Sequence, residues 1–312
     1  MKKFPSWLVL TLFTMVMNGI WGALIEIPEK RMSPPFPTSL GYIVWSLTFI
    51  PCSLYILYRA GWKLDVAPMD ICKGMLVGLL GAGGQFVLFE ALRAGPAYII
   101  FPITSVYPLV TIVLSIIFLR EKAGRWASAG IVLAFISIFL LSLQEPDNSL
   151  VNGYTWLWLS IAGFFMWGFQ AFFAKIFLEK MSAESIFFYI TVGNLFFIPL
   201  AWKMTDFSRP VSFGGALGAS VLIQFLNALA AVFMVFALRK GKVIIISPVS
   251  ALAPMITTVL SLIIYSRMPY VYHAYGIIVA MMALAFITYG EVVNSRLNNK
   301  PVLPNITPNN FK

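Results

Sequence analysis

The sequence has little of what soluble enzymes use for catalysis. Charged residues make up 11% of the 312 residues, against about 25% in soluble domains, and hydrophobic residues make up 60%. The one histidine, His273, cannot form a metal cluster or a catalytic triad by itself, and the two cysteines, Cys52 and Cys72, imply no disulfide framework. The sequence also has no His-Glu-x-x-His, phosphate-loop or Gly-x-Ser-x-Gly motif. We therefore expect no metal, no cofactor and no enzymatic activity.

Long apolar runs are what the sequence has in abundance. Each is about 20 residues long, enough to cross a hydrocarbon core of roughly 30 Å as a helix. Ten such runs are centred near residues 17, 48, 83, 108, 134, 166, 193, 227, 254 and 281. They are expected to be helices, because lipid offers no partners for unpaired backbone groups. The sequence thus predicts an all-α polytopic membrane protein with ten transmembrane helices. Its short loops leave no room for the output domain of a sensor or scaffold.

The two halves of the chain are similar in sequence, which indicates an internal repeat. When the sequence is shifted by 146 positions, residues 91–117 align with residues 237–263 with 13 identities in 27. The same shift carries Trp21-Gly22 onto Trp167-Gly168. Each half holds five spans, an odd number, so the two five-helix repeats are predicted to have inverted topology, as in many secondary transporters. The predicted units are a first repeat (1–143), a linker (144–154), a second repeat (155–291) and a disordered cytoplasmic tail (292–312).

The positive charge of the chain indicates its orientation. The net charge is +10, and a cytoplasmic N-terminus would place 15 Lys and Arg residues on inside segments against 6 on outside segments. The positive-inside rule then predicts that both termini are cytoplasmic and that the protein lies in the cell (cytoplasmic or inner) membrane. The excess of Lys and Arg over Asp and Glu is therefore explained by membrane orientation and does not indicate nucleic-acid binding. The expected partners are membrane lipid and a small-molecule substrate, with a homodimer left open.

Prolines recur at matching places in the fourth and ninth spans. Pro102 and Pro108 of the first half align with Pro248 and Pro254 of the second. A proline inside a helix removes a backbone hydrogen bond, and the freed carbonyl then needs a polar partner or a cavity. Matching interruptions in the two halves indicate a transporter's binding site, so these prolines are predicted to be helix breaks with a gating role. Kinked but inert helices are the alternative.

These segments resemble the EamA-type members of the drug/metabolite transporter superfamily. There, an Ala-Leu-Arg turn, here Ala91-Leu92-Arg93, leads to a proline-containing fourth helix and then to Leu-x-Glu, here Leu119-Arg120-Glu121. The resemblance covers residues 5–290, but the second half has Tyr265-Ser266-Arg267 in place of Leu-x-Glu, so that acid is not duplicated. The resemblance implies alternating access and a central cavity lined by helices 1, 3, 4, 6, 8 and 9. It implies no particular substrate.

Polar side chains in the middle of apolar spans are candidate site residues. The predicted substrate cavity is formed by Asn18, Trp21, Gln85, Glu90, Thr104, Tyr107, Trp167, Gln170, Gln224, Asn227 and Ser250. For Ser and Thr the alternative is a hydrogen bond to their own helix, and for Asn and Gln a bond between helices. Glu90 is also the candidate for proton coupling, with an interfacial ion pair to Arg93 as the alternative. Lys175 is expected to snorkel, with anion pairing in the cavity as its alternative.

Together these features predict a secondary transporter. We expect it to move a small metabolite, an amino acid or a similar compound, by alternating access, with export as the hypothesis for direction. Sugar uptake and the flipping of a lipid-linked substrate are the alternatives.

Overall fold

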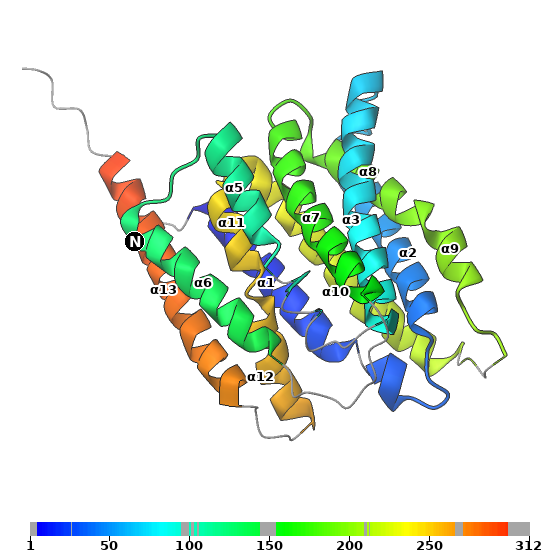
Figure 1. Cartoon of the computed structure of the whole chain (residues 1–312). Coiled ribbons are helices and arrows are strands. Elements are labelled where there is room, and N and C mark those ends of the chain that lie inside the picture. Colours follow the sequence, from blue (N-terminus) through cyan, green and yellow to red (C-terminus); the bar gives the residue numbers. More distant parts are fainter. Residues whose placement is uncertain are drawn as a thin grey trace, which may run out of the picture.

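The computed structural model describes residues 5–25, 27–94, 100, 103–104, 106–143, 154–208, 211, 213–265 and 271–298 (Figure 1). The elements described within these ranges are helical. They are α1 (Ser6–Leu24), the π-helical turn η1 (Ile27–Arg31), α2 (Thr38–Arg59), α3 (Pro68–Ala94), α5 (Pro108–Phe118), α6 (Arg125–Ser142), α7 (Thr155–Phe177), α8 (Ala183–Phe196), α9 (Ile198–Lys203), α10 (Gly215–Lys240), α11 (Val243–Ser250), α12 (Ala253–Tyr265) and α13 (Val271–Asn298).

Ten apolar helical regions account for the ten predicted spans. Six are long and apolar enough to cross a membrane: Ser6–Glu29, Thr38–Arg59, Pro68–Ala91, Thr155–Phe177, Ala183–Lys203 and Gly215–Lys240. Four are shorter: Pro108–Phe118, Arg125–Leu140, Val243–Thr257 and Val271–Ile287. The protein is therefore an all-helical, multi-pass membrane protein, as predicted. Helix α13 continues past residue 291 to Asn298, while residues 144–153 of the predicted linker and residues 299–312 of the predicted tail lie outside the described residues.

In the helix pairs with the most extensive contact, one helix comes from the first half of the chain and the other from the second half. Helix α1 packs against α10 and α12, and their counterparts under the 146-residue shift, α7, α3 and α5, pack together in the same way. Helices α6 and α13, the last of each half, pack along their lengths. Figure 1 shows α1 and α7 running in opposite directions, as inverted repeats require. The two halves thus interleave into one bundle.

Both proline-containing spans are interrupted. The ninth span divides into α11 and α12 at a turn over Ala251 and Leu252, with Pro248 near the end of α11 and Pro254 as the second residue of α12. In the fourth span, Val106 and Tyr107 form a turn, and α5 begins with Pro108. Pro102 lies outside the described residues. The two turns pack in one apolar cluster, in which Val106 joins Leu252.

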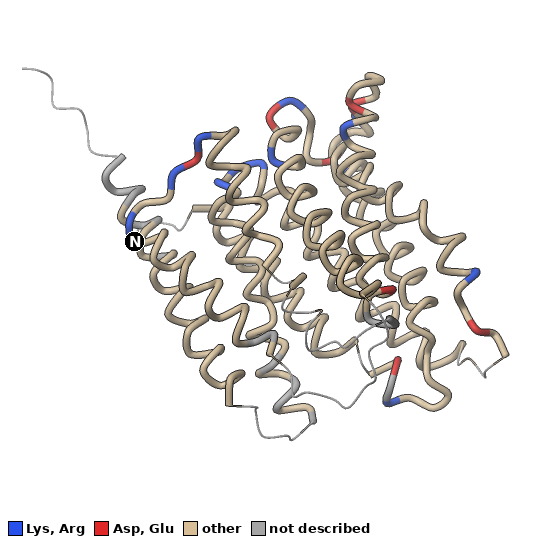
Figure 2. Tube along the Cα trace, in the orientation of Figure 1, with Lys and Arg blue, Asp and Glu red and all other residues tan. Residues whose placement is uncertain are grey.

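Lys and Arg residues gather at one end of the bundle, where α1 begins and α10 ends (Figure 2). We call this the basic end, and the opposite end the far end. The described basic residues at the basic end are Arg59, Lys63, Lys73, Arg120, Lys122, Arg125, Lys175, Lys180, Arg239, Lys240 and Lys242. This uneven distribution is the one that the positive-inside rule associates with a cytoplasmic face.

Candidate functional site

A chain of hydrogen bonds links α1, α2 and α10 in the middle of the bundle. The Nδ2 of Asn227 donates to the Oδ1 of Asn18 over 2.9 Å, and the Oδ1 of Asn227 accepts from the Nε1 of Trp45 over 2.6 Å. One turn away, the Nε1 of Trp21 donates to the Oε1 of Gln224 over 2.8 Å. These amides therefore form bonds between helices, the alternative considered for Asn and Gln, and they also fix two indole rings.

Beside this chain lies a cavity in the half of the bundle nearer the far end. It encloses about 230 Å³ of empty space including its mouth, between α1, η1, α2, α3 and α10. The side chains and backbone around it belong to Trp21, Ile25, Glu29, Gly41, Tyr42, Trp45, Gln85, Phe89 and Gln224. That figure includes open solvent, and the enclosed part of the cavity is about the size of a water molecule.

The aromatic walls of the cavity are held by their neighbours. The rings of Tyr42 and Trp45 lie 5.3 Å apart at 49°, and those of Tyr42 and Phe89 lie 6.1 Å apart at 81°. The hydroxyl of Tyr42 also donates to the backbone oxygen of Asn194 over 3.4 Å. Because the rings stand at steep angles and their polar atoms are engaged elsewhere, the cavity is bounded by several fixed aromatic surfaces.

Glu29 is one of the cavity residues that sequence reasoning missed, and Tyr42 and Trp45 of α2 are others. Glu29 lies in η1, beyond the end of α1. Its carboxylate approaches Gly41 closely enough that a Cβ there would lie 3.2 Å from the Glu29 Oε1 and 3.9 Å from the Gln224 Nε2. Glycine at position 41 therefore makes room for the carboxylate.

Trp167 and Gln170 lie at the counterpart interface, between α7 and α3. A Cβ on Gly84 would lie 2.6 Å from the Nε1 of Trp167, and one on Gly81 would lie 2.1 Å from the Nε2 of Gln170. Both side chains are thus packed directly onto glycines of α3. Neither lines the cavity, so this interface places two predicted site residues in close helix packing.

Three further predicted residues lie at the span breaks. Thr104 donates to the carbonyl of Ile100 over 3.0 Å, and Ser250 donates to the carbonyl of Ser247 over 2.9 Å. Both hydroxyls therefore bond to their own helices, the alternative considered for such residues. Tyr107 packs edge-on against Trp167, with ring centroids 5.9 Å apart.

Of the remaining predicted residues, Gln85 lines the cavity and Glu90 does not. Glu90 is partly buried on α3, next to the cavity residue Phe89. The side chain of Arg93 lies outside the described ones, so the predicted ion pair between Glu90 and Arg93 stays a prediction.

Helix caps close the bundle at the basic end. The ammonium of Lys175 on α7 donates to the carbonyls of Leu238 and Gly241, 2.9 and 2.7 Å away, at the C-terminus of α10. The carboxylate of Glu121 accepts from the backbone N–H groups of Val243 and Ile244, 3.3 and 3.0 Å away, at the start of α11. Each charge complements the helix end that it meets. Lys175 thus caps a helix instead of snorkelling to water or pairing with an anion.

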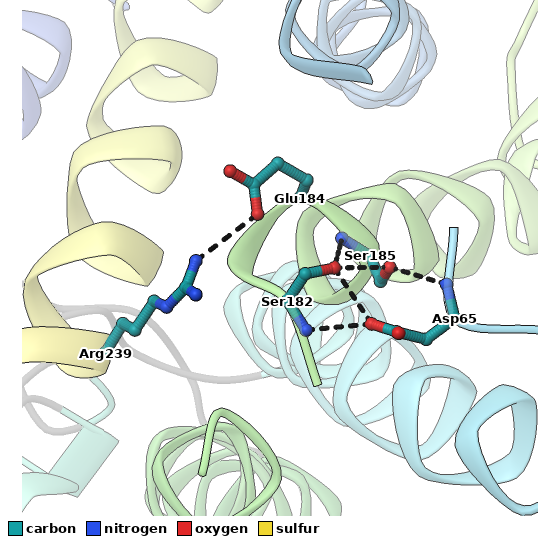
Figure 3. A network of polar contacts seen from close by, with 5 residues as sticks. All are labelled: Asp65, Ser182, Glu184, Ser185 and Arg239. Atoms are coloured by element: carbon teal, nitrogen blue, oxygen red, sulfur yellow. Dashed lines mark hydrogen bonds and ion pairs between the residues drawn. The ribbon is translucent and has the colours of Figure 1, made fainter. Parts of the chain in front are cut away.

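A second anchor at the basic end joins the α2–α3 loop to α8 (Figure 3). Asp65 accepts from both the N–H and the hydroxyl of Ser182, each over 2.8 Å, and Ser182 caps α8 through the N–H of Ser185. These hydrogen bonds outweigh desolvation and lower the pKa of Asp65 below its ordinary value. Beside them, Glu184 pairs with Arg239 of α10 over 3.5 Å.

The described residues hold no group of three or more His, Cys, Asp or Glu side chains that could bind a metal ion. The polar contacts between helices include helix caps, amide bonds and hydroxyl groups that donate to carbonyls of a neighbouring helix, as Ser137 does to Gly276.

Comparison with known proteins finds one family in both halves. The sequence matches the EamA-like transporter family over residues 5–143 and again over residues 154–289. An uncharacterized protein of Methanocaldococcus jannaschii is 43% identical over 138 residues, which are 44% of this chain and 97% of that protein. That relative therefore has about the size of one repeat.

Two longer matches and one solved structure extend the likeness. The protein LicB of Haemophilus influenzae is 22% identical over 271 residues, 79% of this chain and 93% of that protein. An uncharacterized transporter of Archaeoglobus fulgidus is 29% identical over 157 residues, 49% of this chain and 51% of that protein. A crystal structure superposes with a TM-score of 0.67 at 17% identity over 93% of this chain and 99% of that one, which shows a shared fold.

Proposed function

Because this chain belongs to the EamA-like transporter family, which both of its halves match, we propose that it is a secondary transporter that moves a small polar metabolite by alternating access. The family is one of transporters and not of enzymes. The cavity lined by Trp21, Glu29, Trp45 and Gln224 is the observation that carries the proposal, because it places polar and aromatic groups together inside the bundle.

The two ends of the bundle differ as a transporter in one of its end states would. The cavity lies toward the far end, whereas at the basic end Lys175 joins α7 to the end of α10 and Glu121 joins the α5–α6 loop to the start of α11. In the proposed cycle these caps separate when the basic end opens. The interruptions near Pro108 and Pro254, which pack against each other, supply the points about which the half-helices move.

We further propose that the basic end faces the cytoplasm and that the substrate is exported. The gathering of Lys and Arg residues at that end supports the orientation. Proton exchange through Glu90 stays the proposed source of energy. A Glu90→Gln variant that transports at the undiminished rate, independent of pH, would show that Glu90 has no such role.

Ligand-induced thermal stabilisation of the purified protein tests the proposal. Amino acids, sugars, nucleosides and carboxylates would be screened, followed by counterflow of the stabilising compound in proteoliposomes. We expect one class to raise the melting temperature and to exchange across the membrane, and we expect both effects to be lost in Gln224→Leu. Stabilisation that survives in this variant would place the site elsewhere.

A further inference from the structure

Side chains from three parts of the chain converge on the short turn that joins α10 to α11, Gly241 and Lys242. Lys175 on α7 donates to two carbonyls at the end of α10, 2.9 and 2.7 Å away. Glu121 in the α5–α6 loop accepts from two N–H groups at the start of α11, 3.3 and 3.0 Å away. The indole of Trp7 on α1 packs on Gly241, where a Cβ would lie 2.6 Å from the Trp7 Cδ2. The turn is therefore held from three sides.

The charges at this turn match the helix ends that they meet. The last carbonyls of a helix carry partial negative charge, and the first N–H groups carry partial positive charge. Lys175 and Glu121 are both partly buried, so salt screens their contacts less than it would at an exposed site. Lys242 also donates to the carbonyl of Lys122 over 3.1 Å, which joins the turn to the α5–α6 loop a second time. We call the contacts of Trp7, Glu121, Lys175 and Lys242 at this turn the latch.

Every latch residue is replaced at its counterpart in the inverted repeat. The 146-residue shift relates Lys175 to Glu29, Glu121 to Arg267, Trp7 to Gly153 and Lys242 to Pro96. A carboxylate has no proton to donate to the carbonyls at the end of a helix, and a guanidinium has no acceptor for the N–H groups at the start of one. Glycine lacks a ring, and proline lacks a side-chain donor. The sequence of the other copy therefore cannot form the same latch.

We propose that the latch makes the two end states of the protein unequal, so that without substrate it rests with its basic end closed and its far end open. The inference rests on the proposed function, because it takes alternating access between two such states as given. Exactly equivalent repeats would give the two states equal free energy, and contacts that only one copy can form favour the state that contains them. A substrate that opens the basic end must therefore bind that state more tightly, by enough to offset the latch.

Cysteine labelling at the two ends tests the inference without any substrate. Val243→Cys reports on the basic end, because Val243 is fully buried beside the turn and cysteine has a similar size. Ile25→Cys reports on the cavity toward the far end. Each would be placed in a Cys52→Ala, Cys72→Ala background, and the purified protein would be treated with a water-soluble methanethiosulfonate reagent. We expect slow labelling at position 243 and rapid labelling at position 25.

Breaking the latch should change the two labelling rates in opposite directions. We expect Lys175→Met and Glu121→Met each to raise the rate at position 243 roughly tenfold, because each removes hydrogen bonds to a charged group. The double variant should raise it further and should also slow labelling at position 25, because a larger share of the molecules then has its far end closed. Lys180→Met, at an exposed position of the basic end, is the control and should change neither rate.

Two results in the double variant would overturn the inference: an unchanged rate at position 243, or labelling at position 25 that is not slowed. Faster labelling at both positions belongs to the second case and would indicate a loosened bundle. Counterflow of the screened amino acids, sugars, nucleosides and carboxylates in proteoliposomes separates this failure from failure of the transport proposal. Opposite shifts without exchange of any of these compounds would support the latch and contradict their transport. Exchange with unchanged labelling would support transport and contradict the latch.

Discussion

Two interfaces that the internal repeat makes equivalent have opposite chemistry. Between α1 and α10, which we call the amide seam, Asn18 and Trp21 meet Asn227 and Gln224 through hydrogen bonds beside a cavity. Between α7 and α3, which we call the glycine seam, the 146-residue shift replaces Gln224 by Gly78, Asn227 by Gly81 and Asn18 by Phe164. The same pair of helices thus occurs twice, and the size of the side chains decides which copy borders a cavity.

Equivalent positions also differ between the two ends of the molecule. The shift that relates the halves carries Glu29 onto Lys175. Because the repeats are inverted, Glu29 lines the cavity toward the far end, whereas Lys175 caps α10 at the basic end. Equivalent positions thus carry opposite charges in different surroundings, one in the cavity wall and one at a helix end.

The largest predicted effect is the loss of stability when a side chain is added to α3 at a glycine that packs directly against α8. A Cβ on Gly78 would lie 2.4 Å from the backbone oxygen of Tyr189, which cannot move away as a side chain could. We expect Gly78→Leu to destabilise the protein by about 3 kcal/mol or more. Gly218→Leu is the matched control, because nothing lies within 4 Å of a Cβ there. Thermal unfolding in detergent measures both, and equal melting temperatures would contradict the close packing.

A second prediction separates the two seams by function. Asn227→Leu leaves the indole N–H of Trp45 and the amide of Asn18 without this partner. Because the indole of Trp45 then loses the bond that fixes it in the cavity wall, we expect ligand affinity to fall roughly 5- to 150-fold, the range of a typical coupling free energy. Gln170→Leu is the control on the glycine seam and should bind ligand normally. Binding to both variants, each checked for normal membrane insertion, measures the difference, and equal losses would show that the seams share the site.

The cap at the basic end predicts a smaller loss of stability. Lys175→Met removes the donor to the carbonyls of Leu238 and Gly241, so we expect a cost of about 1–2 kcal/mol. Lys180→Met, at an exposed position of the same end, should leave the melting temperature within a degree or two of the wild type. Matching melting temperatures for the two variants would show that the cap contributes no stability.

The smallest prediction concerns pH. The pKa of Asp65 is lower in the folded protein than in the unfolded chain, so its hydrogen bonds stabilise the fold above the unfolded pKa, about 3.9. That contribution is lost as the pH falls through the folded value. Because Asp65 is partly exposed, we expect about 1 kcal/mol or less. Asp65→Asn should lower the melting temperature more at pH 7 than at pH 3, and an equal decrease at both values would contradict the assignment.

The helices and the two related halves of this molecule could be predicted from the sequence, because membrane spans and internal repeats are directly visible in the order of residues. Ten apolar runs and the alignment around Pro108 and Pro254 led to ten helices in two related halves. Lipid restricts the backbone so strongly that apolar length alone indicates a spanning helix. The family resemblance followed from the same repeated segments.

The site could be predicted only in part, because pairing between distant residues leaves no mark on one sequence. Asn18, Trp21, Gln224 and Asn227 were recognised as polar groups inside spans, but their partners depend on how α1 meets α10. Glu29 follows Pro28 and precedes two basic residues, a pattern that indicates the interface as readily as a cavity wall. The roles of Lys175 and Glu121 likewise depend on helix ends far away in sequence.

The most direct test of a single functional seam compares two equivalent positions. Ile25 lines the cavity, and its counterpart, Ala171, is buried with 7% of its surface exposed. Ile25→Cys and Ala171→Cys would each be placed in a Cys52→Ala, Cys72→Ala background and treated with a water-soluble methanethiosulfonate reagent. The account predicts rapid labelling at position 25, slowed by bound ligand, and little labelling at position 171. Equal labelling of both, or ligand protection at position 171 alone, would contradict it.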